Sequence, residues 1–150
     1  MKLRVYVAGI ITGLTAEEVF KYFDSAKKTL EDFGYDVFTP VAGKDMCRVE
    51  KRKFASQQKS KIPQLTNHAI IERDRWMVKN SDIIFCDLSG KDTASIGCTS
   101  ELAWAHDNGV HSVVILPEEH VMRHAFILEM ADVLFDNRED ALIYMDSLIK

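Results

Sequence analysis

The residues best placed to do chemistry fall within positions 82–101. The apolar run 83–86 is typical of a strand buried on both faces of a parallel sheet, and a helix carrying Glu101 follows a loop of small residues. Ligands of such sheets bind beyond the carboxyl ends of the strands, where helix N-termini offer free amides. The groups that we expect to hold an anion there are Ser95, Thr99 and the amides around Gly97. A carboxylate beside this pocket predicts chemistry on a phosphorylated or hydroxyl-rich small molecule.

The elements that must position these residues alternate between strands and helices. Alternating or apolar runs predict strands at 3–8, 35–39, 82–87, 112–116 and 133–135. Helical spacing predicts helices at 15–33, 69–79, 97–107, 120–130 and 139–149. This order favours one α/β domain over residues 1–150, with a doubly wound, flavodoxin-like or Rossmann-like, five-stranded parallel sheet.

Local signals fix the ends of two of these helices. Thr15 and Glu18 have the spacing of a capping box, in which each side chain binds a backbone amide at the start of a helix. Gly34 is placed to end the same helix, and Gly109 ends the helix that carries Glu101.

The composition predicts a folded protein of the cytoplasm. The chain has 150 residues, of which 47% are hydrophobic and 28% charged, and no apolar run reaches the roughly 20 residues that span a bilayer. A strand pattern begins almost at the first residue, so we expect no signal peptide. The three cysteines have no Cys-x-x-Cys spacing, which favours reduced thiols.

Charge is spread unevenly along the chain. Residues 41–66 hold seven basic and two acidic side chains, net +5, whereas the rest of the chain carries −9 of the total of −4. An acidic body argues against binding to nucleic-acid polymers. We interpret residues 41–66, which lack a clear period, as a mobile basic insertion. The segment is either a solvated loop or a lid that attracts phosphate.

Four motifs in register resemble the nucleoside 2-deoxyribosyltransferase family. The order and spacing agree from residue 3 to about residue 130, with the basic segment as the chief departure. The motifs are Val5-Tyr6-Val-Ala-Gly9, Glu72-Arg-Asp74-Arg-Trp, Ser-Asp82-Ile-Ile-Phe-Cys-Asp87-Leu and Gly97-x-x-x-Glu101-Leu-Ala-x-Ala. The resemblance implies an enzyme that cleaves the N-glycosidic bond of a (deoxy)nucleoside or of its 5′-monophosphate.

The resemblance also implies roles for individual residues. Glu101 matches the nucleophile that attacks C1′ of the sugar, Asp74 matches the acid that handles the departing base, and Tyr6 matches the tyrosine that orients the nucleophile. Gly9 and Gly97 are expected to contact the substrate. For Asp87, at the end of a strand, three roles stay open, namely catalysis, binding of sugar hydroxyls, or capping of the next loop.

One position is similar to a particular branch of the family. Ser95 stands six residues before the glutamate, where the typical transferases have an aspartate and the 2′-deoxynucleoside 5′-monophosphate N-glycosidases have a serine that contacts the phosphate. Those relatives also take a serine from a neighbouring subunit, and His124 occupies the matching position here. Thr12 stands where they carry an arginine. The resemblance therefore implies a homodimer or larger homo-oligomer, with segment 118–128 near the partner's pocket.

The implied chemistry sets requirements for the two carboxyl groups. Cleavage makes the sugar positive and the base negative, so a carboxylate at C1′ and an acid beside the base would both help. We expect the helix dipole to keep Glu101 ionised, and we expect burial or a like charge to raise the pKa of Asp74. Whether a second base or water resolves the intermediate decides between transferase and hydrolase, and the sequence leaves that open.

Other kinds of site have weaker support. His120 and His124 lie four residues apart, but no third ligand is evident, so we expect no metal and no cofactor. A non-catalytic nucleotide-sensing module on the same fold is the alternative, since a fold alone does not define a function. The joint presence of Tyr6, Asp74 and Glu101 favours the enzyme.

Overall fold

A computed structural model describes residues 1–49, 53–57 and 59–150 of the chain. It contains a five-stranded sheet in the order β2-β1-β3-β4-β5, and every neighbouring pair is parallel. The strands are β1 (Arg4–Gly9), β2 (Asp36–Phe38), β3 (Ile83–Asp87), β4 (His111–Ile115) and β5 (Val133–Phe135). The strand order reverses between β1 and β3, which is the switch point where doubly wound sheets bind ligands. The predicted flavodoxin-like α/β fold is confirmed.

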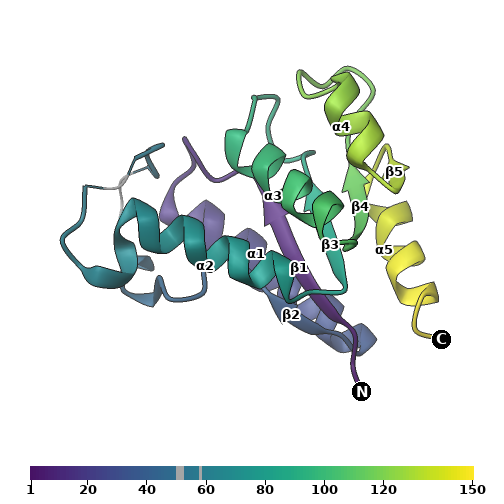
Figure 1. Cartoon of the computed structure of the whole chain (residues 1–150), viewed down its shortest axis with the longest axis horizontal. Coiled ribbons are helices and arrows are strands. Elements are labelled where there is room, and N and C mark those ends of the chain that lie inside the picture. Colours follow the sequence, from purple (N-terminus) through teal and green to yellow (C-terminus); the bar gives the residue numbers. More distant parts are fainter. Residues whose placement is uncertain (50–52, 58) are drawn as a thin grey trace.

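Helices cover both faces of this sheet. They are α1 (Ala16–Phe33), α2 (Asn67–Lys79), α3 (Ile96–Asp107), α4 (Ala125–Met130) and α5 (Arg138–Ser147), with short 3₁₀ helices at Asp45–Cys47 and Pro63–Leu65. In Figure 1, α2 and α3 lie side by side in front of the sheet, while α1 lies behind it. No helix in the described part of the chain is long and apolar enough to cross a membrane.

The capping signals of α1 act as predicted. The Thr15 hydroxyl accepts a hydrogen bond from the Glu18 amide at 3.2 Å, and the Glu18 carboxylate accepts from the Thr15 amide at 3.4 Å. Gly34 follows the helix with φ of 116°, in the left-handed region that glycine adopts without strain.

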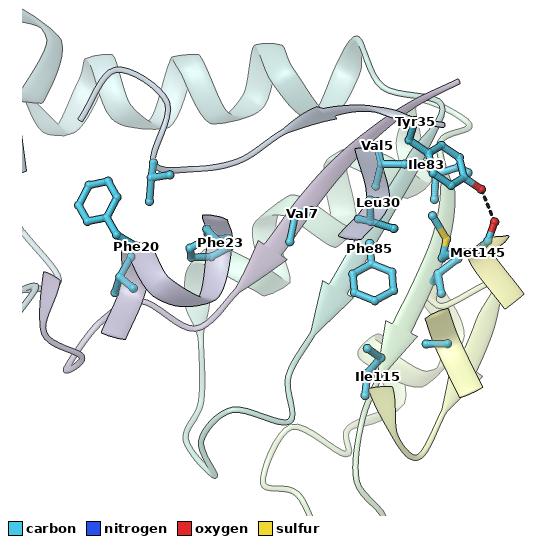
Figure 2. Packing of buried hydrophobic residues seen from close by; sticks show 14 of the residues in the cluster. Val5, Val7, Phe20, Phe23, Leu30, Tyr35, Ile83, Phe85, Ile115 and Met145 are labelled. Carbon is cyan, nitrogen blue, oxygen red and sulfur yellow. Dashed lines mark hydrogen bonds between the residues drawn. The ribbon is translucent and has the colours of Figure 1, made fainter. Parts of the chain in front are cut away.

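One face of the sheet packs against α1 and α5. Val5 and Val7 of β1 and Phe85 of β3 point to this side and belong to a buried cluster that includes Phe23 and Met145. Figure 2 shows this packing together with the hydrogen bond that the Tyr35 hydroxyl donates to the Met145 carbonyl at 2.6 Å.

The alternate residues of the same strands point to the other face. Tyr6, Ala8, Ile84 and Cys86 are buried there with side chains of α2 and α3. Because side chains alternate along a strand, the pattern that fills the first core also directs Tyr6 toward α2 and α3. Those two helices carry Asp74 and Glu101.

Two sequence predictions need correction. The helix expected from His120 begins only at Ala125, because the His120 ring accepts a hydrogen bond from the Met122 amide and so holds a non-helical turn. The basic segment is not wholly mobile, since its residues Val41, Cys47 and Leu65 are buried in the core. The predicted charges at positions 50–52 lie outside the described residues.

Candidate active site

The candidate site lies on the α2–α3 face of the sheet, beside the switch point. Tyr6, in the middle of β1, is fully buried, and its hydroxyl donates a hydrogen bond to Oε2 of Glu101. Glu101 is only 7% exposed, so its carboxylate points into the molecule and not into solvent. The bond joins side chains 95 positions apart and fixes the orientation of the carboxylate.

Asp74 reaches the same place from α2. It is an electrostatic neighbour of both Tyr6 and Glu101. Its Oδ1 atom is shielded from water and has no hydrogen-bond partner among the residues that the structure describes. Buried polar atoms are normally paired, so this oxygen is available to a donor, or with its own proton to an acceptor, on a ligand. The structure thus brings together Tyr6, Asp74 and Glu101, as the sequence predicted.

Burial makes the charged form of Asp74 unfavourable. It raises the pKa of Asp74 from its usual 3.8 to about 6, although the positive charges of Lys44 and Arg73 act in the opposite direction. This agrees with the raised pKa that the sequence analysis expected for the acid beside the leaving base.

The pKa of Glu101 is also raised, well above its usual range. Burial is the main cause, followed by Cys98 and Asp74, while the hydrogen bond from Tyr6 and the charge of Lys44 oppose it. The expected lowering by the helix dipole is wrong. Glu101 lies six residues beyond the N-cap Ser95, and the dipole effect falls off within the first turn. Burial thus disfavours the charged form of both carboxyl groups.

A lysine that carries no motif in the sequence is an electrostatic neighbour of both carboxyl groups. Lys44 comes from the turn after β2 and is only 6% exposed. Burial lowers the pKa of Lys44, the nearby charges of Asp74 and Glu101 raise it, and Arg73 lowers it further. Lysine is rarely buried in proteins. The segment around Lys44 is rich in exposed lysines, and nothing in the sequence distinguishes Lys44 from them.

The backbone around Lys44 is held against α2. Gly43 has φ of 78°, and a Cβ atom built on it would lie 3.2 Å from Cζ of Arg73. Arg73 in turn donates a hydrogen bond from Nη1 to the carbonyl of Gln64 at 3.0 Å. Gly43 therefore allows a close approach that a larger residue would block, and this approach sets the course of the chain at Lys44.

Asp87 is engaged by groups of its own chain. Its Oδ1 accepts from the amide and hydroxyl of Ser89, at 2.9 and 2.5 Å. Its Oδ2 accepts from the hydroxyl of Tyr22 at 2.9 Å and from Nε of Arg138 at 2.6 Å. Of the three roles left open, the structure shows the capping of the loop after β3. Gly9 is paired with Asp87 across β1 and β3. A Cβ atom added to Gly9 would lie only 3.2 Å from the Tyr22 ring.

Ser95 and Gly97 lie at the start of α3, as predicted. The Ser95 hydroxyl caps the helix by accepting from the Cys98 amide at 3.1 Å, whereas the Thr99 hydroxyl donates back to the Ser95 carbonyl at 2.9 Å. At Gly97, an added Cβ would meet only the Ser95 hydroxyl, at 4.0 Å, so the surface there is open to a ligand.

His124 is not gathered into this group within one chain. It is exposed at the N-terminus of α4, where its Nδ1 accepts from the Phe126 amide at 3.2 Å and its ring stacks on Phe126. His120 faces inward and bonds the carbonyl of Lys91 through Nε2 at 2.7 Å. Across the described residues, no three histidine, cysteine or carboxylate side chains are grouped to hold a metal ion.

Comparison with known proteins identifies the fold. No protein-family model matches the sequence, and curated proteins give no match either. A 2-deoxyribosyltransferase from the psychrotolerant bacterium Bacillus psychrosaccharolyticus matches with a TM-score of 0.64 and 18% identity, over 93% of this chain and 90% of that one.

Two further solved structures are similar. A conserved protein from Enterococcus faecalis V583 has a TM-score of 0.67 and 16% identity, over 99% of each chain. A CMP N-glycosidase from Clostridium botulinum has a TM-score of 0.59 and 16% identity, over 96% of this chain and 98% of that one. The chain therefore has the fold that a 2-deoxyribosyltransferase and a CMP N-glycosidase share.

Proposed function

We propose that this protein cleaves the N-glycosidic bond of a (deoxy)nucleoside or of its 5′-monophosphate. The observation that carries the proposal is the buried hydrogen bond from Tyr6 to Glu101 with Asp74 as an electrostatic neighbour. A nucleotide sensor has no need for a buried carboxylate oriented in this way. The fold shared with a 2-deoxyribosyltransferase and a CMP N-glycosidase supports the same class of reaction.

In the first step, the Glu101 carboxylate attacks C1′ while the bond from C1′ to the base nitrogen breaks. The electron pair of the broken bond goes to the base, and Asp74 gives its proton to that base. The product is a glycosyl ester of Glu101. In the second step, water or another base attacks C1′ and gives its proton to the Asp74 carboxylate, while the bond from C1′ to Glu101 breaks and the carboxylate is released.

The reaction needs different protonation states of the two carboxyl groups. The productive enzyme has a proton on Asp74 and none on Glu101, and both groups have raised pKa values in the same site. Tyr6 favours the productive state because its hydrogen bond stabilises the charged form of Glu101.

The start of α3 would hold the sugar or its 5′-phosphate. The Ser95 hydroxyl, the open surface at Gly97 and the free amides of the first helical turn provide donors there. Lys91, in the loop between β3 and α3, has its Nζ 3.1 Å from where a Cβ atom on Gly13, in the loop after β1, would lie. This cation compensates for Thr12, which replaces the arginine of the similar glycosidases.

The remaining groups complete our proposal. Gly9 and Asp87 shape the end of the pocket between β1 and β3, and His124 contributes to the site of a neighbouring subunit in a homodimer or larger homo-oligomer. The exposure of His124 at the N-terminus of α4 supports that assignment.

The test is release of the base from a panel of deoxynucleosides and their 5′-monophosphates, measured by chromatography with and without an acceptor base. We expect release from at least one substrate and a loss of about 10³-fold or more in Glu101→Ala. Glu31→Gln, at an exposed position on α1, is the control and should keep full activity.

Exchange of bases identifies a transferase, and release without exchange identifies a hydrolase. Unchanged turnover in Glu101→Ala would exclude the mechanism.

A further inference from the structure

The mechanism above leaves the buried side chain of Lys44 without a task. Lys44 is only 6% exposed, and within the described parts of the chain its ammonium forms no hydrogen bond and no ion pair within 4.0 Å, although it is not among the fully shielded atoms that lack a partner. An unpaired buried charge is costly. The charges of Asp74 and Glu101 offset that cost only from a distance. The ammonium is thus free to bind a group that is brought in by a ligand.

The surroundings of Lys44 suit a planar, electron-rich ring. Lys44 lines a cavity of about 520 Å³, which is within the range of small-molecule sites. Phe54, Ile62 and Ile70 supply apolar walls, and the described lining residues include Lys59 and Lys61 but no carboxylate. Apolar walls can cover the faces of a heterocycle, while a cation can bind an oxygen on its edge.

Lys44 is an electrostatic neighbour of both Asp74 and Glu101. Asp74, which we assign to the leaving base, is the first of the charges that act on Lys44, and Glu101, which we assign to the sugar, acts more weakly. The contact between Gly43 and Arg73 holds this turn against α2. Asp74 is not among the described residues that line the cavity, so Lys44 is the residue that links the cavity to the two carboxyl groups.

We propose that Lys44 is a catalytic residue that donates a hydrogen bond to a carbonyl oxygen of the leaving base. This inference rests on the proposed function and assigns it a substrate class, nucleosides or nucleotides whose base carries a ring carbonyl. As the bond from C1′ breaks, its electron pair moves into the base and increases the negative charge on that oxygen. Lys44 stabilises this charge and keeps its proton, while Asp74 supplies the proton that the ring nitrogen takes up.

The test compares two substrates that differ in leaving ability but hardly in shape. The substrates are the deoxyribosides of uracil and 5-fluorouracil, or their 5′-monophosphates. The value of kcat/KM on each is measured for wild type and for Lys44→Met, which keeps the aliphatic part of the side chain. We expect kcat/KM of the variant to fall about 10²-fold on the uracil substrate. The loss should be much smaller with 5-fluorouracil, because that base leaves more readily without help.

Lys79→Met is the matched control. It removes an exposed lysine from the last turn of α2, the helix of Asp74, and should change neither rate. An equal loss on both substrates would point to a structural role and would overturn the assignment of Lys44, and so would no loss at all. Thermal unfolding should show that Lys44→Met is at least as stable as wild type, because the variant no longer buries a charge.

A binding measurement separates this inference from the proposed function. Calorimetry with free uracil should show binding to wild type and to Glu101→Ala, and binding weaker by about tenfold or more to Lys44→Met. Equal affinity of wild type and Lys44→Met would overturn the role of Lys44 whatever the turnover. Uracil binding that depends on Lys44, in a protein that cleaves no substrate, would overturn the proposed reaction and leave the contact to the base standing.

Discussion

Asp74 is held in an environment that favours its uncharged form, and this has a cost in stability. Its pKa of about 6 in the folded protein lies above its usual 3.8. The folded state therefore retains the proton more strongly than the unfolded state does. The resulting stabilisation is complete below about pH 4 and is lost as the pH rises through 6. At neutral pH, the group that the mechanism needs as an acid makes the fold less stable.

Asp74→Asn should therefore stabilise the protein at neutral pH while it abolishes most activity. The amide cannot ionise, so above pH 6 we expect the free energy of unfolding of the variant to exceed that of wild type by up to about 3 kcal/mol. Near pH 4 the two proteins should differ little. Denaturant unfolding at pH 4 and pH 7.5 measures both values. An equal difference at the two pH values would show that ionisation of Asp74 is not the cause.

Tyr6 acts on Glu101 and not directly on the bond that breaks. Its hydrogen bond opposes the rise in the pKa of Glu101, so Tyr6→Phe should raise that pKa further. The acid limb of the profile of kcat/KM against pH should move to higher pH, with a rate loss of about 10²-fold at pH 6. Tyr35→Phe loses a buried hydrogen bond on the opposite face, to the Met145 carbonyl. That control should lower stability and leave the pH profile in place.

Among the helices and strands, the sequence predicts those features that depend on residues close together in the chain. The apolar run of β3, the capping box at Thr15 and the stop at Gly34 all occur as predicted. The start of α4 was missed because the His120 ring binds a backbone amide two residues ahead, and spacing alone does not reveal that competition.

The candidate site was predictable only in part, for a related reason. Tyr6, Asp74 and Glu101 lie within motifs that can be recognised in one sequence. Lys44 carries none, and its burial depends on contacts that the turn after β2 makes with α2, far along the chain. Its role follows from tertiary packing, which turns one lysine of a basic segment inward.

The turn that carries Lys44 provides a test of positioning by the backbone. Gly43→Ala forces a side chain into the left-handed region and toward the Arg73 guanidinium, so we expect a loss of about 1–3 kcal/mol in stability. We also expect a lower kcat/KM, because Lys44 would shift with the turn. Gly90→Ala, where nothing lies within 4 Å of the added atom and φ is not left-handed, should be close to neutral. A stable and fully active Gly43→Ala would show that this approach does not position Lys44.

Two exposed apolar side chains lie on the segment that leads into α4 and on α4 itself. Val121 is 58% exposed and Phe126, which stacks on His124, is 70% exposed. This region adjoins the start of α3, because the Ser95 amide contacts the sulfur of Met122. A second copy of the chain that covers this edge would bury the apolar groups and bring His124 to its neighbour's α3.

Phe126→Asp should therefore reduce both assembly and activity. We expect wild type to be a dimer or larger oligomer by light scattering, and the variant to associate more weakly by about 2 kcal/mol or more, since a charge replaces an aromatic anchor. Turnover should fall with dilution in step with the oligomer, because each site would need its neighbour. Ile143→Asp changes an equally exposed apolar residue on α5, 63% exposed, and should affect neither property. A monomer with full activity at every concentration would show that one chain holds the complete site and that His124 has no part in it.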